Sequence, residues 1–117
     1  MAVMEAPARK ECDLENRLKI LPENVLTIQE ELSPIVKELI REGYILLYPN
    51  PILPIFRNND GDMLLAKKEG AGLRVRIYDQ RTDSLINYNK IKPVEEVRKT
   101  LTSLERLAQI RYSLQAH

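Results

Sequence analysis

The chain has 117 residues, of which 44% are hydrophobic and 30% charged, and its formal net charge is +1. This size and balance allow one small folded domain and do not fit an intrinsically disordered chain. The single cysteine, Cys12, excludes an internal disulfide, and the single histidine, His117, excludes a His-based zinc site or a His-dependent triad within the chain.

No apolar run reaches the roughly 18 residues that a membrane-spanning helix needs, and the N-terminus lacks the pattern of a signal peptide. We therefore expect an intracellular protein without a membrane partner. Charge is uneven along the chain: residues 67–111 hold eleven Lys and Arg against six Asp and Glu, about +5. This asymmetry favours an anionic partner for the second half of the chain.

Residues 1–24 are polar and mixed in charge, and we expect a flexible leader with at most a turn or two of helix within residues 10–21. The domain is predicted to span residues 25–117. Its first helix begins either near residue 28, after a capping box of Thr27 and Glu30, or at Pro34 with Ser33 as the N-cap. Gly43 is placed to end this helix near residue 42.

Residues 44–56, "YILLYPNPILPIF", contain three prolines, which cannot donate to a sheet ladder, so we expect an extended segment at a sheet edge. An antiparallel hairpin is predicted over residues 52–79, with turns at Asp60-Gly61 and at residues 70–72. "SLINYNKI", residues 84–91, is a candidate for one more short strand.

The strand "LRVRIYD" alternates apolar residues at 73, 75 and 77 with Arg74, Arg76 and Tyr78. It therefore has one apolar face and one basic face. The arginines are compatible with two interpretations. They either block pairing at an exposed sheet edge or, together with Arg81, form a stripe that contacts phosphates.

The C-terminal segment begins with Pro93 and carries Glu95 and Glu96 in its first turn, as helix starts do. Apolar residues then recur at a spacing typical of an amphipathic helix that runs to about Arg111. They are Val94, Val97, Leu101, Leu104 and Ala108. This stripe either docks on the hairpin or serves dimerisation. The predicted fold is thus a small α+β domain: helix, antiparallel hairpin, C-terminal amphipathic helix.

The order of these parts resembles the fingers region of retroviral and retroelement reverse transcriptases, over roughly residues 27–114. The similarity rests on "SPIVKELIREGYI", "PILPIFRNNDG", "GAGLRVRIYDQR" and the spacing from Val94 to the "YS" at 112–113. The resemblance implies that Arg57 contacts nucleotide phosphates, with Arg74 or Arg76 in a similar role on the next strand. It also implies that Asp79 and Arg81 make structural and template-side contacts.

The chain departs from that family where catalysis begins, because Ala116 stands at the place of the first metal-binding aspartate and the later paired aspartates are absent. Two-metal nucleotidyl transfer requires carboxylates that hold both cations. The resemblance therefore implies a catalytically inactive fragment with weak RNA or DNA binding through the basic hairpin, without a cofactor. The alternative is a protein-interaction or self-association module that uses Val94, Val97, Leu101 and Leu104 of the C-terminal helix, or the edge strand.

Overall fold

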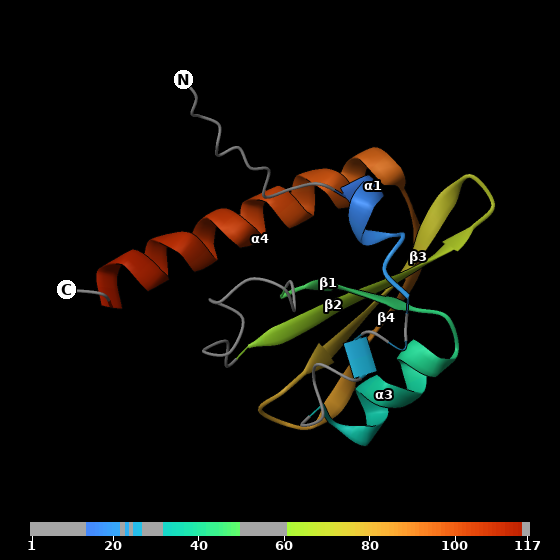
Figure 1. Cartoon of the computed structure of the whole chain (residues 1–117), viewed down its shortest axis with the longest axis horizontal. Helices are drawn as coiled ribbons and strands as arrows, with labels where there is room; N and C mark the ends of the chain where they lie inside the picture. Colours follow the sequence, from blue (N-terminus) through green and yellow to red (C-terminus); the bar gives the residue numbers. More distant parts are fainter. Residues whose placement is uncertain (1–13, 22, 24, 27–31, 50–60, 116–117) are drawn as a thin grey trace.

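A four-stranded antiparallel sheet lies between two helices, one on each face, in the computed structural model (Figure 1). The structure describes residues 14–21, 23, 25–26, 32–49 and 61–115. This arrangement confirms the predicted α+β class. The elements are α1 (Leu14–Arg17), α3 (Pro34–Arg41), β1 (Ile45–Tyr48), β2 (Asp62–Glu69), β3 (Gly72–Asp79), β4 (Ser84–Pro93) and α4 (Val94–Gln115).

The strands pair in chain order, β1-β2-β3-β4. Residues 45–48 of the proline-containing segment form β1, an edge strand of the sheet in the described part of the chain. This agrees with the sequence-based prediction. β3, the "LRVRIYD" strand, lies between β2 and β4. The interpretation of its arginines as guards of an exposed edge is therefore wrong, because both sides of this strand are paired.

The β2–β3 hairpin has a continuous register from Asp62↔Asp79 to Glu69↔Gly72. Its two-residue turn begins with Gly70 at a φ of 62°, a left-handed conformation that glycine adopts without steric cost. The predicted hairpin is confirmed over residues 62–79. The first part of that prediction, including Asp60, lies outside the described residues.

The helix α3 begins where Ser33 and Pro34 predict. The Ser33 hydroxyl accepts a hydrogen bond from the Ile35 N–H at 3.2 Å, and Pro34 occupies the first turn. The helix ends in a Schellman-type motif, in which Gly43, at a φ of 108°, donates to the carbonyl of Ile40. The alternative start at residues 27–30 lies outside the described residues.

One face of the sheet packs against α3. The core on this side includes buried apolar side chains of the helix, of β1, β2 and β3, of the segment before α3 and of the residue before β1. They are Val25, Leu32, Val36, Leu39, Ile40, Tyr44, Leu46, Met63, Leu65 and Tyr78. Tyr78 belongs to this cluster although the sequence placed it on the basic face of β3. The face that carries Arg74 and Arg76 is thus covered by a helix at its Tyr78 end.

The opposite face packs against α4 and α1. The buried residues of this second core come from α1, three strands and the first half of α4. They are Leu14, Leu47, Tyr48, Leu64, Ala66, Leu73, Val75, Val97 and Leu101. The predicted docking of the C-terminal helix on the hairpin is therefore confirmed.

Helix α1 differs from the flexible leader expected for residues 1–24. Leu14 is fully buried in the α4-side core and Arg17 is buried as well. A single leucine placed against apolar neighbours, and an arginine that finds acceptors, bring this polar segment into the domain. Residues 1–13 lie outside the described part of the chain.

Candidate functional site

Arg74 of β3 is engaged within the domain. Its Nε donates to Glu69 Oε1 at 2.5 Å and its Nη2 to Glu69 Oε2 at 3.1 Å, a bidentate ion pair, while Nη1 donates to Asn89 Oδ1 at 2.9 Å. The hydrogen bonds from Arg74 lower the pKa of Glu69, and those to Glu69 raise the pKa of Arg74. An incoming phosphate would have to displace this carboxylate.

Arg76 and Lys67 lie on the same face of the sheet as Arg74, since Lys67 is registered opposite Arg74 and Arg76 is two residues further along β3. Lys67 Nζ is 5.1 Å from the centroid of the Tyr44 ring and 3.5 Å from the carbonyl oxygen of Glu42 at the end of α3. Arg76 is half-buried, and its Nε is a buried donor without a hydrogen-bond acceptor among the described residues.

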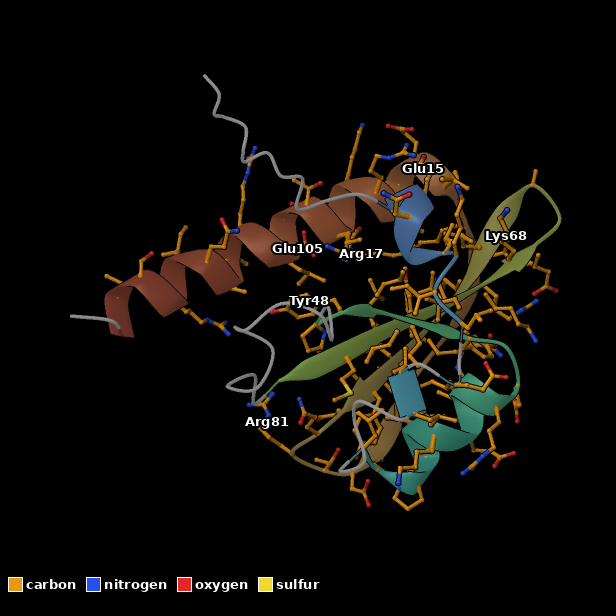
Figure 2. All side chains as sticks on the ribbon, in the orientation of Figure 1. Glu15, Arg17, Tyr48, Lys68, Arg81 and Glu105 are labelled. Atoms are coloured by element: carbon orange, nitrogen blue, oxygen red, sulfur yellow. The ribbon has the colours of Figure 1, made fainter. Side chains whose placement is uncertain are left out.

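Arg81 lies at the other end of β3, in the turn that leads to β4, and Figure 2 shows it far from the β2–β3 turn near Lys68. Its side chain is 74% exposed, and its Nε is 3.7 Å from Asp79 Oδ1. Asp79 Oδ1 also accepts the backbone N–H of Arg81 at 3.0 Å. The structure therefore brings Arg74 and Arg76 together but not Arg81, and Arg57 lies outside the described residues.

A buried ion pair that the sequence analysis missed joins α1 to α4. The Arg17 guanidinium donates through Nη1 to the carbonyl oxygen of Leu47 at 2.9 Å and through Nη2 to Glu105 Oε2. The side chains of Arg17 and Glu105 are 5% and 2% exposed, and they face each other between the two helices in Figure 2. Burial raises the pKa of the neighbouring Tyr48, with opposing contributions from Arg111, which lowers it, and Glu105, which raises it.

The sequence did contain a signal for this pair. Glu105 follows Leu101 by four residues and Val97 by eight, so it lies on the inward stripe of the helix. A carboxylate at such a position requires a buried partner. The sequence does not indicate that the partner is Arg17, 88 residues earlier.

The inward stripe of α4 is occupied by the domain itself. Val97 is 2% exposed and Leu101 fully buried, whereas Val94 and Leu104 are half-buried against the same core. The structure does not favour the alternative interpretation, in which these four residues serve protein interaction or self-association, because their apolar surface already packs on the sheet.

A second set of apolar side chains on α4 is exposed instead. Leu107, Ile110 and Leu114 are 53%, 56% and 70% exposed. Their 3-4 spacing places them in one line along the helix, displaced by about a third of a turn from the inward stripe. We call these three residues the α4 stripe and residues 106–115 the free half of α4. This half extends past the end of the sheet in Figure 1.

The described residues contain no group of three or more His, Cys, Asp or Glu side chains that could hold a metal ion. Among the same residues, no helix has the length and apolar content required to cross a membrane. No protein-family model, curated protein or solved structure matches the chain. The resemblance to reverse-transcriptase fingers therefore stays a prediction.

Proposed function

We propose that this chain is a non-catalytic protein-interaction domain and that its contact surface is the free half of α4. The observation that carries the proposal is the exposure of Leu107, Ile110 and Leu114 in one line on a helix that continues beyond its own core. A single exposed leucine is ordinary on a protein surface. Three large aliphatic side chains at helical spacing are the pattern that helix-in-groove recognition uses.

The core of the domain does not account for this half of the helix. Among the α4 side chains that the structure describes, the buried ones are Val97, Leu101 and Glu105, all before residue 106. After Glu105, Ala108 is the one apolar side chain packed against the core among those that the structure describes. The free half of α4 thus exposes apolar surface and buries little of it in the domain. This supports a role in contacts outside the domain.

The proposal is tested with a photo-crosslinking amino acid placed at Ile110, in cells of the organism that encodes the chain. The matched control places the same group at Ile86 of β4, which is 39% exposed and lies far along the chain from the stripe. We expect a discrete crosslinked protein species from position 110 and none from position 86. Equal or absent products from both positions would contradict the proposal.

Weak binding of RNA or DNA by the basic face of β2 and β3 is a second candidate function. It is favoured by one observation: the unsatisfied Nε–H of Arg76 lies on the same sheet face as Arg74 and Lys67. A phosphate held by arginine forks would supply acceptors there. The Glu69–Arg74 ion pair opposes such binding, so we expect it to be weak.

Anisotropy titration of a labelled RNA–DNA primer-template at several salt concentrations tests this second candidate. Two phosphate contacts predict that log K falls with log salt with a slope of about −2, and that the slope disappears in an Arg74→Ala, Arg76→Ala, Arg81→Ala variant. A control variant removes three exposed cations elsewhere, Lys19, Arg41 and Lys99. Equal losses in both variants would mean general charge attraction without a site.

A further inference from the structure

We infer that the partner of the free half of α4 is a protein groove with an apolar floor and an acidic rim. This inference rests on the proposed function and adds the chemistry of the partner. A second copy of this chain, which is the simplest alternative occupant, fits the same surface poorly.

Charge supports the acidic rim. Residues 106–115 contain Arg106 and Arg111 and no Asp or Glu. Both arginines are exposed. At 3.6 residues per turn, Arg106 projects next to Ile110 on one side of the α4 stripe and Arg111 next to Leu107 on the other. The stripe is thus bordered by a positive charge on each side.

These two arginines are also available for a partner. Two half-buried cations at the start of α4 are paired, Lys92 with Glu96 at 2.7 Å and Arg98 with Glu95 at 2.6 Å. Within the described part of the chain, neither Arg106 nor Arg111 has a carboxylate within ion-pair distance. Carboxylates on a groove rim would supply the missing counter-charges and orient the helix in the groove.

A second copy would supply the wrong charges and too little area. A symmetric dimer sets the same patch against itself, so four arginines and no carboxylate would surround six aliphatic side chains. Like charges at such a contact are destabilising. The stripe offers only a few hundred Å² at most, against the roughly 800 Å² per partner of a standard stable interface. A groove encloses the helix on several sides and gains area from its flanks.

The helix is ready to bind before a partner arrives. Glu105, through Arg17, fixes α4 to α1 and to the carbonyl of Leu47 directly before the free half begins. The stripe continues the same helix, so binding does not require a separate folding step for the segment. Because no ordering cost is added, a short stripe can suffice to bind a partner whose groove surrounds the helix.

The experiment uses calcium-loaded calmodulin as a defined probe, because it is an acidic protein with a Met-rich apolar groove that accepts amphipathic helices. The full chain, labelled at its single cysteine, Cys12, is titrated with calmodulin by anisotropy, with and without calcium. We expect calcium-dependent binding that weakens as salt rises.

Two variants separate the contributions of the stripe and of its borders. Leu107→Ser, Ile110→Ser, Leu114→Ser should abolish binding, and Arg106→Glu, Arg111→Glu should weaken it by about tenfold or more. The matched control reverses two exposed cations away from the stripe, Lys19→Glu and Arg41→Glu, and should bind like the parent chain. Circular dichroism of each variant verifies that α4 is retained.

Three results would overturn the inference. The first is calmodulin binding that is absent or unaffected by Arg106→Glu, Arg111→Glu. The second is a dimer in light scattering that the stripe variant dissociates, which would assign the surface to a second copy. The third is binding to phosphatidylserine vesicles without binding to calmodulin, which would assign it to an anionic membrane surface. If crosslinking at position 110 still captures a protein in the first case, the proposed function stands and only the partner chemistry is wrong.

Discussion

The two helices that cover the sheet use their lengths differently. Helix α3 has 8 residues; Val36, Leu39 and Ile40 are buried, and Ile35 packs half-buried against the same core. Helix α4 has 22 residues, and Glu105 is the last fully buried side chain among those described for it. The core therefore sets the length of α3 but not that of α4. The proposed interaction rests on this difference, because the aliphatic side chains of the free half of α4 stay exposed in the folded domain.

Removal of Arg17 should have the largest effect on the free energy of unfolding, because Arg17 pairs with Glu105, the buried residue next to the free half of α4. Arg17→Ala leaves the Glu105 carboxylate buried without its partner, and we expect a loss of about 3–5 kcal/mol in the free energy of unfolding. Urea denaturation measures it. Replacing both residues, Arg17→Met with Glu105→Leu, should recover most of the loss.

The matched control for this prediction is Glu95→Ala, which breaks the Arg98–Glu95 pair on the exposed side of the same helix. Glu95 is 68% exposed, so we expect a change of only about 0.5 kcal/mol. If Arg17→Ala cost no more than Glu95→Ala, the buried pair would not fix α1 to α4.

A pair of leucine substitutions sharpens the contrast between the halves of α4. Leu101 is fully buried, so Leu101→Ala should cost about 2–5 kcal/mol through lost burial and the cavity left behind. Leu107 is 53% exposed, so Leu107→Ala should change stability by about 0.5 kcal/mol or less. Thermal or urea unfolding of both variants checks the difference. A similar cost at both positions would mean that the free half of α4 is packed in solution.

The smallest effect concerns the α3 side of the sheet and depends on pH. Asp83 accepts hydrogen bonds from Tyr78 at 2.5 Å and from Ser33, the N-cap of α3, at 2.9 Å. The bond from Tyr78, followed by that from Ser33, lowers the pKa of Asp83 from its ordinary 3.8. The folded state thus binds this proton less readily than the unfolded state. The stabilisation is present above pH 3.8 and is lost as pH falls through the lowered pKa.

We therefore expect Tyr78→Phe to reduce the drop in melting temperature between pH 5 and pH 3, because it removes the largest cause of the shift. Tyr88→Phe, on β4, is the control for loss of a tyrosine hydroxyl. If the drop in melting temperature were the same in Tyr78→Phe as in the parent chain, protonation of Asp83 would not be a cause of the acid sensitivity.

Local signals in the sequence were sufficient for several elements. Ser33-Pro34 and Gly43 marked the ends of α3, the prolines placed β1 at an edge, and the turn at Gly70 located the β2–β3 hairpin. Each of these features depends on backbone geometry within a few residues. Such geometry is readable from residue types alone.

What the sequence did not reveal depends on neighbours that are distant in the chain. Alternation in β3 identified two faces but not that helices cover both of them, so it did not indicate that Tyr78 packs against α3. The polar segment before residue 25 gave no sign that Leu14 and Arg17 would be buried by β1 and α4. The engagement of Arg74 by Glu69 follows from the hairpin register, which sequence patterns predict less well than the existence of the hairpin.

The sequence separation of Arg17 and Glu105 has a consequence for how the chain is made. Strands β1 to β4 each pair with the next strand, so the sheet can assemble in the order in which the ribosome delivers it. Arg17 emerges early, yet its carboxylate partner is translated 88 residues later. Helix α1 can contact β1 earlier, through Leu47, but its ion pair with α4 cannot form until Glu105 has left the exit tunnel. This ion pair is therefore a late contact of the fold, formed after all four strands have been translated.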